Sequence, residues 1–582
     1  MGFGAELGKV SFWLALCNDA RVRFLRFRDD RQRDGLNRPG RRASLIALVL
    51  GASVAVFFFA CSEQPMAADG YYYGDADVSD GDHNVGNTSS GGGAAIPPPE
   101  QELEETFVAP VVSGETLWSA NPDTNKIARI FASTLEIEVL QGGHAPTYLA
   151  PLPSGVTKGG ALVLNARSHD ASIFIEDEDG STFEHRVAVQ EGASAWTVGS
   201  KGAFAIAWSR AADALLDPLD GYQDLVVLSI NDSSVQTTAL SVGFRPSRAF
   251  INEDESRAYI VSGPGISVIS LGANVEILRE IFLPEELPGQ SRDVVFTLDG
   301  SLALVRVNQS NEILLIETES GQQKSLLLPG AATDLDISGD GSTAVAVVRG
   351  VASQAENGQG GMGGQESTSD QESLIALLPT STIFEHPDEF LTVTTAEVVG
   401  SAVVASDASR VLLFTNAEPN ARLSILDTES LQMRVVDMKA PVQAAFISQD
   451  ANYAATIMSA AVGSDKVGAF GLIPLAEALT PRIEGTETRP NFVSWADDPA
   501  RAIITTEASP TKNASTYFAR LPHLTVDRIE LPSAPLSAGV VNDAGRAFVS
   551  QAHPEGRITF IDLDDGSEQT LTGFELNSKV VD

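Results

Sequence analysis

The sequence predicts an all-β fold, a β-propeller of four-stranded blades, and three observations support this prediction. From about residue 105 to the C-terminus, a turn carrying Asp, Gly or Lys returns about every 45 residues, followed by alternating small and apolar residues. A second alternating run, which ends in a polar turn, follows each first run. Helical periodicity is nearly absent. A repeat of this length made of short strands is typical of a propeller.

The turns that mark the repeat set the number of units. Successive marks are 41 to 53 residues apart, except for one spacing of 67. The two wide spacings contain a loop-like insertion at 211–221 and a tract rich in Gly, Gln, Glu and Ser at 353–373, and without that tract the spacing returns to about 45. Ten units exceed the roughly four to eight blades of most propellers, so we expect one ring of about seven to ten blades. The marks are Gly114, Lys158, Lys201, Asp254, Asp299, Asp340, Asp407, Asp450, Asp498 and Asp543.

Each unit contains enough strand signal for one blade. Alternation with a period of two, bounded by Asp, Asn, Gly and Ser, indicates half-buried strands joined by tight turns. Two such hairpins per unit make a four-stranded sheet. The one helical candidate, Leu475 to Leu479 between Pro474 and Pro481, has room for only a turn or two. The clearest runs are 299–305, 340–346 and 543–549 after the marks, and 313–321, 423–430 and 558–566 further on.

Three stretches carry a family resemblance. Residues 117–130, Leu-Trp-Ser-Ala-Asn-Pro-Asp-Thr-Asn-Lys-Ile-Ala-Arg-Ile, resemble the bacterial YVTN-type propeller repeat, in which a "VAN" strand end precedes a polar turn and a second strand. The Asp-Gly-Ser copies at 299–301 and 340–342 resemble the "PDG" turn of YVTN- and WD-like bacterial propellers. The resemblance covers roughly 105–582, although no copy shows the full pattern and WD dipeptides are missing. It implies the fold and transfers no active site, since such propellers include binding proteins, scaffolds and some enzymes.

The N-terminus resembles a bacterial lipoprotein signal. Residues 43–60 form an uncharged apolar run directly after an Arg-rich stretch, and their length lies between that of a signal core and that of a transmembrane helix. The run ends in Phe58-Phe59-Ala60-Cys61, which resembles a lipobox with Phe58 in place of the usual Leu. We therefore expect a signal peptide at 1–60, with a long n-region at 1–42, and lipidation of Cys61. The alternative is an uncleaved anchor, and both place the propeller outside the cytoplasm.

Cysteine use and composition favour an exported, tethered domain. The chain contains only Cys17 and Cys61. Removal of the signal would leave one cysteine and no disulfide, which a large core does not require. Residues 61–104 lack Lys and Arg and are rich in acidic residues, Gly, Pro and Ser, so we expect a disordered tether that holds the propeller at 105–582 away from the membrane. Ser62 is compatible with sorting to the outer membrane, on its periplasmic or surface face.

The charge of the chain excludes some partners. The formal net charge is −38, but residues 1–42 hold 10 of the 39 basic residues and 5 of the 77 acidic ones. The rest of the chain therefore has 29 basic and 72 acidic residues. Nucleic-acid binding requires clustered positive charge, so we expect no nucleic-acid partner. Solubility explains the acidity, and attraction of cations or basic partners is the alternative.

Motif matches for metals and cofactors do not fit their structural contexts. The acidic run 75–82 fails as a calcium loop, because placing Gly81 at position six puts Ala76 at position one. The run 358–363 matches GxGxxG but is followed by a strand rather than a helix. The acidic runs 176–180 and 562–566 are better explained as hairpin turns, with a metal role as the alternative. The sequence thus predicts no cofactor and no metal site.

Catalytic motifs are also missing: there is no GxSxG, no P-loop and no HExxH. His144 and His169 are the first candidates for a site gathered in a central channel. We expect Trp118, Trp196, Trp208 and Trp495 to pack in the core, because they do not form the repeated motif of a quinone-cofactor propeller. The seven histidines have no metal-ligand spacing; they are His83, His144, His169, His185, His386, His523 and His553.

These observations predict a lipid-anchored protein of the cell envelope. Its propeller would act as a monomeric binding or scaffold module that presents loops at one end of the ring to a protein, peptide or glycan partner. The alternative is a propeller enzyme, a lactonase-like hydrolase or an oxidoreductase. It predicts carboxylates and histidines that converge at the channel mouth with a divalent cation. A purely structural envelope component is the third possibility.

Overall fold

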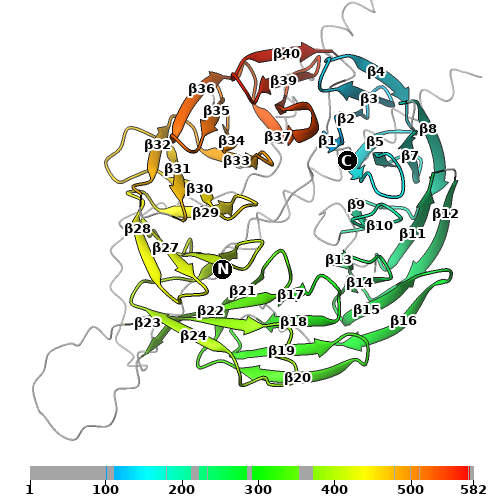
Figure 1. Ribbon diagram of the computed structural model, residues 1–582. Helices are drawn as coiled ribbons and strands as arrows, with labels where there is room; N and C mark the ends of the chain where they lie inside the picture. The colour runs from blue at the N-terminus through cyan, green and yellow to red at the C-terminus, as the bar shows by residue number, and fades with distance from the viewer. Residues whose placement is uncertain are drawn as a thin grey trace, which may run out of the picture. The chain divides into compact units, whose positions relative to one another are not determined.

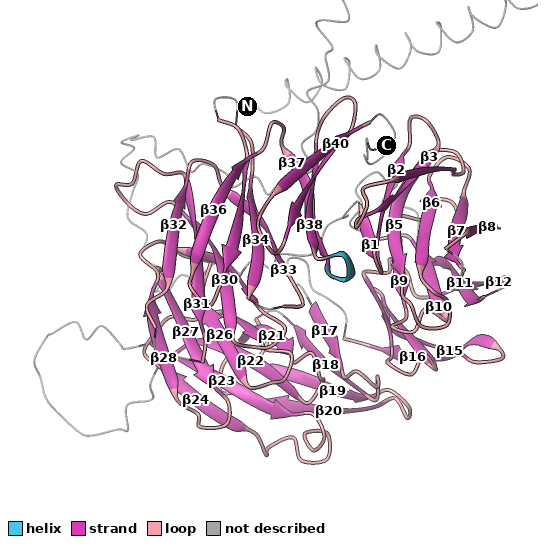
Figure 2. Cartoon of the chain, turned by 45° about the horizontal axis from the view of Figure 1, so that its top comes forward, coloured by secondary structure: helices cyan, strands magenta, loops and turns pink. Residues whose placement is uncertain are grey.

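The computed structural model describes residue 100 and residues 110–582, except for 178–179, 211–221, 233, 285–291, 308, 353–370, 477–478, 499, 510–511, 574–575 and 577–582. Within these residues, forty strands form ten four-stranded sheets, each made of four consecutive antiparallel strands. The single helical element there is one 3-10 turn, Asn542–Ala544 (Figure 2). The prediction of an all-β propeller is confirmed, and the ten units are ten blades.

The first five blades contain twenty strands, four per blade in chain order. They are β1 (Val111–Ser113), β2 (Thr116–Asn121), β3 (Lys126–Phe131), β4 (Ile137–Gln141), β5 (Pro146–Leu152), β6 (Gly160–Asn165), β7 (Asp170–Glu176), β8 (Thr182–Ala188), β9 (Ala195–Val198), β10 (Phe204–Trp208), β11 (Asp224–Asn231), β12 (Ser234–Ser241), β13 (Arg248–Ile251), β14 (Arg257–Val261), β15 (Gly265–Leu271), β16 (Val275–Phe282), β17 (Arg292–Phe296), β18 (Leu302–Val307), β19 (Glu312–Glu317) and β20 (Gln322–Leu327).

Blades 6 to 10 follow the same plan. Their strands are β21 (Ala332–Ile337), β22 (Thr343–Ala352), β23 (Gln371–Pro379), β24 (Leu391–Thr395), β25 (Ser401–Val404), β26 (Arg410–Phe414), β27 (Arg422–Asp427), β28 (Met433–Asp437), β29 (Val442–Ile447), β30 (Tyr453–Ser459), β31 (Gly468–Pro474), β32 (Arg482–Thr486), β33 (Pro490–Trp495), β34 (Arg501–Thr506), β35 (Ser515–Arg520), β36 (Thr525–Glu530), β37 (Pro535–Val541), β38 (Arg546–Gln551), β39 (Arg557–Asp562) and β40 (Glu568–Thr572).

The strands of a blade differ in burial with their distance from the ring axis. In Figure 1 the fourth strand of each blade lies at the outer rim. The second strand of blade 1, β2, is buried at every position, whereas the fourth strand of blade 4, β16, alternates between half-buried and exposed residues. Middle strands read as nearly continuous apolar runs because neighbouring blades cover both of their faces. Rim strands keep the alternation of a sheet with one solvated face.

Hydrophobic packing between neighbouring blades holds the ring together. Ten clusters of buried apolar side chains each join two consecutive blades. The cluster that closes the ring packs Leu117 and Ile130 of blade 1 against Phe548 and Phe560 of blade 10. Figure 1 shows blade 10, β37 to β40, beside blade 1, β1 to β4. Because blade 10 is built from β37 to β40 alone, the first and last blades share no sheet. The ring closes through side-chain packing, where each buried Phe contributes about 1.5–3 kcal/mol.

All ten turn marks lie between the first and second strands of a blade. The turn between the third and fourth strands lies beside this turn: Thr318 donates from Oγ1 to the carbonyl of Gly300 at 2.5 Å, and Thr380 to that of Gly341 at 2.7 Å. We call this side of the ring the turn face. The loops between second and third strands, and the connections from one blade to the next, lie on the opposite side, which we call the loop face.

The Asp-Gly-Ser turns are closed by a clasp of side-chain hydrogen bonds. In blade 5, Thr297 donates from Oγ1 to Asp299 Oδ1 at 2.6 Å, and the backbone N–H of Ser301 donates to the same oxygen at 3.0 Å. Gly300 adopts a left-handed φ of 71°, which favours glycine. Burial would raise the pKa of Asp299, but the hydrogen bonds from Thr297 and Ser301 outweigh it and lower the pKa below its ordinary value. Blades 6 and 8 repeat the clasp at Asp340 and Asp450.

The two sequence insertions both connect the second and third strands of a blade, and the described ends of these strands lie on the loop face. Residues 211–221 lie between β10 and β11, and the Gly-rich tract lies between β22 and β23, which begins at Gln371. The GxGxxG match at 358–363 is outside the described residues, but β22 and β23 are antiparallel neighbours. A dinucleotide fingerprint joins parallel strands, so this match is a false one.

Other sequence predictions fall partly or wholly outside the described residues. The short helix expected at Leu475 to Leu479 is not formed where the chain is described: Leu475 and Ala476 make a bend, and 477–478 are not described. The signal peptide at 1–60 and the tether at 61–104, which begins at Cys61, also lie outside the described part, apart from Glu100. Among the described residues, no helix has the length and apolarity to cross a membrane.

Candidate functional site

Glu100, which precedes the ring in the sequence, has its side chain in a cleft between blades 6 and 7. The cleft lies on the loop face. Its walls come from Arg349 near the end of β22, from Ser401 at the start of β25, and from the loop 415–417 after β26. We call this the Glu100 cleft.

Five groups converge on the Glu100 carboxylate. Arg349 forms an ion pair with Oε1, and Thr415 donates from Oγ1 to the same oxygen at 2.8 Å. The other oxygen, Oε2, accepts from the backbone N–H of Asn416 at 2.9 Å, from that of Ala417 at 3.3 Å, and from Ser401 Oγ at 3.4 Å. Both carboxylate oxygens are thus held by donors, and two of these donors are backbone N–H groups whose positions are fixed by the chain.

The cleft is shielded from solvent. Only 3% of the Glu100 side chain and 7% of the Arg349 side chain are exposed. Burial lowers the pKa of Arg349, and Glu418 opposes this change. Gly400 leaves room for the Glu100 carboxylate, because a Cβ at position 400 would overlap Glu100 Oε1. A buried guanidinium is costly unless a carboxylate pairs with it, so this cleft is built around a negative charge.

Carboxylates on the innermost strands fix the two blades that form the cleft. On β21, Asp334 accepts from the backbone N–H of Ala402 at 2.6 Å, and Asp336 accepts from that of Val404 at 2.9 Å. Both acceptors thus bind the next inner strand, β25. Burial raises the pKa of Asp336, and hydrogen bonds from Val404 and Ile337 oppose the rise. These bonds set the distance between blades 6 and 7, and therefore the width of the cleft.

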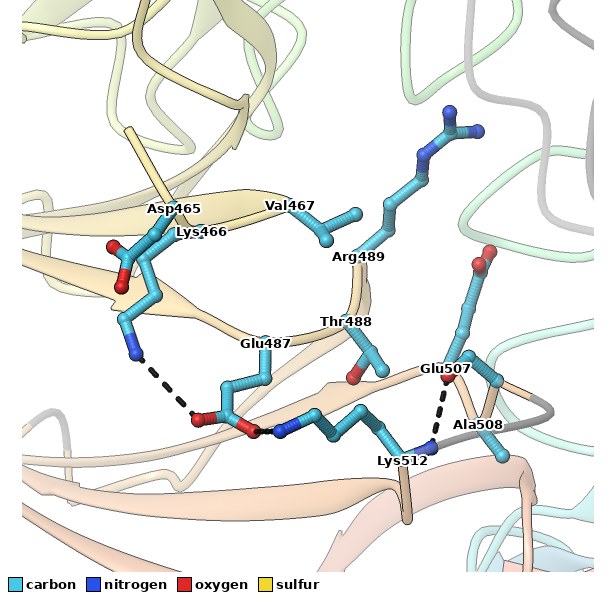
Figure 3. Close-up of a pocket in the computed structure, with 10 residues that line it drawn as sticks. Asp465, Lys466, Val467, Glu487, Thr488, Arg489, Glu507, Ala508 and Lys512 are labelled. Carbon is cyan, nitrogen blue, oxygen red and sulfur yellow. Dashed lines mark hydrogen bonds and ion pairs between the residues drawn. The ribbon is translucent and has the colours of Figure 1, made fainter. Parts of the chain in front are cut away.

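A second hollow on the loop face lies between blades 8 and 9, with a volume of about 520 Å³. It is lined by the loop after β30, the connection 487–489 and the loop after β34. Figure 3 shows two lysines reaching Glu487 from different sides. Lys512 Nζ is 2.8 Å from Glu487 Oε2, and Lys466 Nζ is 3.6 Å from Oε1. This ion pairing lowers the pKa of Glu487, which is open to solvent.

Glu507 at the edge of this hollow behaves differently. Its pKa is raised, because surrounding atoms desolvate the carboxyl although the side chain is open on one side, and Arg489 counteracts the rise. A perturbed carboxyl in a hollow is a candidate for chemistry. Within the described part of the chain, however, no three His, Cys, Asp or Glu side chains lie close enough to hold a metal ion. The converging cluster that the enzyme hypothesis predicts is therefore not found among these residues.

The structure brings the two candidate histidines into neighbouring loops of the loop face. His144 lies in the connection between β4 and β5, and His169 in the loop between β6 and β7. The backbone N–H of His144 donates to Ser168 Oγ at 3.0 Å, and its carbonyl accepts from the backbone N–H of Arg167 at 3.2 Å. The contacts of His144 are thus those of a loop residue. His169 adopts a left-handed φ of 51° in a tight turn.

The tryptophans and the acidic runs have the structural roles that the sequence predicts. Trp118 is fully buried and stacks on Phe174 with ring centroids 5.7 Å apart, and the other three belong to the clusters between blades. The run 176–180 joins β7 to β8, and 562–566 joins β39 to β40, so both are hairpin turns. Glu176 pairs with Arg129 at 2.9 Å. Residues 178–179 of the first turn are not described.

Comparison with known proteins supports no closer assignment. No protein-family model and no curated protein matches the chain. Solved structures with a similar fold include a eukaryotic initiation factor (11% identity, 70% of this chain and 95% of that chain, TM-score 0.48). Others are the dihydro-heme d1 dehydrogenase NirN (12%, 71% and 73%, TM-score 0.39) and the β-propeller domain of Myceliophteria thermophila Cps50 (Swd1) (9%, 56% and 96%, TM-score 0.30). With TM-scores below 0.5, these likenesses carry no argument about function.

Proposed function

We propose that this protein is a lipid-anchored component of the bacterial cell envelope whose propeller binds a protein or peptide partner through the loop face. A propeller in general supports binding or scaffolding, with loops on a rigid ring as the contact surface. The Glu100 cleft is the observation that carries the proposal. It holds one side chain from outside the ring with five donors, which is how a protein holds a peptide ligand.

The proposed location in the cell envelope depends on lipidation of Cys61, and a separate experiment tests it. Cells expressing the protein would be grown with radioactive palmitate, and the labelled chain would be compared with Cys61→Ser. We expect label in the parent protein, in the membrane fraction, and none in the variant. A parent chain that stays in the membrane fraction without label would contradict the lipid anchor and favour the uncleaved apolar anchor at 43–60. Label that persists in Cys61→Ser would contradict Cys61 as the acylated residue.

The binding surface is tested with a photoreactive amino acid at one exposed position on each face. Val462, in the loop between β30 and β31, is fully exposed on the loop face, and Ser320 is exposed on the turn face. We expect a discrete crosslinked partner from Val462 in intact envelopes and none from Ser320. Equal crosslinking from both positions, or none from either, would contradict a partner-binding loop face.

A further inference from the structure

The Glu100 cleft differs from an ordinary surface ion pair in where its two halves come from. Arg349, Ser401, Thr415 and the loop after it belong to blades 6 and 7 and are fixed by the ring. Glu100 belongs to no blade: it precedes β1, which lies in blade 1, while the cleft is formed by blades 6 and 7. These residues of blades 6 and 7, which we call the receptor half, are therefore all in place without the segment that contains Glu100.

The receptor half also has a reason to remain preformed. Arg349 Nη2 donates to Thr415 Oγ1 at 2.5 Å, so the guanidinium and the hydroxyl are aligned by each other as well as by Glu100. Asn416 is held from the other side by a bond from Nδ2 to the carbonyl of Gln443 at 3.0 Å. A preformed site loses little conformational entropy when a ligand enters. With Glu100 withdrawn, a buried positive charge would face an opening of carboxylate size.

We propose that the Glu100 cleft is a receptor for a glutamate side chain of an acidic peptide, and that Glu100 occupies it in cis until a partner's glutamate replaces it. This inference rests on the proposed binding function and names the chemistry of the partner. The exchange costs little, because the incoming carboxylate makes the same five contacts that Glu100 gives up. Occupation in cis lowers the affinity for a peptide in trans by competition.

The test uses the full chain in detergent and a fluorescent peptide with the sequence of residues 96–105, Ile-Pro-Pro-Pro-Glu-Gln-Glu-Leu-Glu-Glu. Glu100→Ala vacates the cleft. We expect this variant to bind the peptide at least about thirtyfold more tightly than the parent chain, because a hydrogen-bonded buried charge pair is worth a factor of that size or more. The matched control peptide changes only the glutamate at position 100 to Gln and keeps the other three.

Two further variants separate recognition from folding. In the Glu100→Ala background, Arg349→Met should abolish peptide binding, and the milder Thr415→Val should weaken it by about tenfold, since it removes one donor of five. Thermal unfolding of each variant checks that the ring is folded. If Arg349→Met does not fold, Thr415→Val still tests the site.

The outcomes distinguish the possible ligands and the two proposals. Free glutamate or acetate that competes as well as the peptide would show a small-carboxylate site and overturn the peptide assignment. Equal binding of both peptides, or equal binding by the parent and Glu100→Ala, would also overturn it. If no peptide binds to folded Glu100→Ala while Val462 still crosslinks to a partner, this inference fails and the proposed binding function stands. If the peptide binds but Val462 crosslinks to no partner, the cleft recognises glutamate and the proposed partner-binding function of the loop face fails.

Discussion

The two faces of the ring differ in how the backbone hydrogen-bonding groups of their turns and loops find partners. On the turn face, short turns repeat from blade to blade and close on themselves through the Asp clasps at Asp299, Asp340 and Asp450. On the loop face, the connections vary in length and contribute to the Glu100 cleft and to the hollow beside Glu487. The turn face therefore serves the fold, and the loop face is free to vary and to bind, as loops on a rigid scaffold commonly do.

The comparison predicts where substitutions act on stability and where they act on binding. The largest loss in the free energy of unfolding should follow a change on the turn face, and changes on the loop face should act chiefly on contacts with a ligand. Four substitutions or deletions test this division.

The largest effect is expected on the turn face, at Glu255. This buried residue has a left-handed φ of 58°, and its carboxylate accepts backbone N–H bonds from Lys201, Ala203 and Phe204 of the preceding blade. Glu255→Ala leaves those three donors without their acceptor and should lower the free energy of unfolding by about 3 kcal/mol. Chemical denaturation measures this. The exposed neighbour Glu253 is the control, and Glu253→Ala should change stability by at most about 0.5 kcal/mol.

The next effect is that of Glu100→Ala on the loop face. Arg349 then loses its ion pair while buried, so we expect a loss of about 2 kcal/mol in the stability of the ring. Acetate at high concentration should restore part of it by binding the empty cleft. If Glu100→Ala lowers the free energy of unfolding as much as Glu255→Ala does, the Glu100 cleft mainly stabilises the fold. That result would contradict the assignment of stability to the turn face and binding to the loop face.

A smaller effect is expected for one clasp. Burial would raise the pKa of Asp340, but hydrogen bonds from Ser338 and Ser342 lower it below its ordinary value of 3.8. The clasp therefore stabilises the fold above that value and loses this contribution as the pH falls through the lowered pKa. Asp340→Asn should cost about 0.5–1 kcal/mol at neutral pH, because solvent screens this mostly exposed group.

The pH dependence provides the check on this prediction. The difference in stability between the parent and Asp340→Asn should shrink on acidification to about pH 3 and below. Asp543→Asn, at the equivalent turn of blade 10, is the matched control, because Asp543 is exposed, and it should change the free energy of unfolding at neutral pH by at most about 0.5 kcal/mol. A difference for Asp340→Asn that is constant from neutral to acid pH would contradict the role of the charged clasp.

The smallest effect is expected when the insertion between β22 and β23 is shortened. These strands are antiparallel neighbours that a short turn can join. Replacing residues 354–369 by a four-residue Gly-Ser linker should change the melting temperature very little, because loop length contributes weakly to closure entropy. The same linker placed between Asp340 and Ser342 on the turn face should lower it by several degrees. Equal effects would remove the distinction between the faces.

The repeat made most of the fold predictable from sequence. The marks from Gly114 to Asp543 all lie at the same turn of their blades, because a tight turn needs particular residues locally and leaves a direct trace in the sequence. The Glu100 cleft left no comparable trace. Glu100 was assigned to an acidic tether by composition, and Arg349 and Thr415 are 66 residues apart with nothing in their local patterns to join them. Ring geometry alone brings the three together.

The ten units, their pairs of hairpins and the turn chemistry could be predicted from the sequence, since these depend on residues within about 45 positions of one another. Tertiary structure alone decided three things: that one ring closes with ten blades, that it closes by packing Phe548 and Phe560 against blade 1, and which side chains meet on the loop face. The reason is the separation along the chain between the residues that interact. Hydrogen bonds within a hairpin are local, whereas ring closure and a buried ion pair depend on the sum of ten inter-blade packing angles, which no single segment encodes.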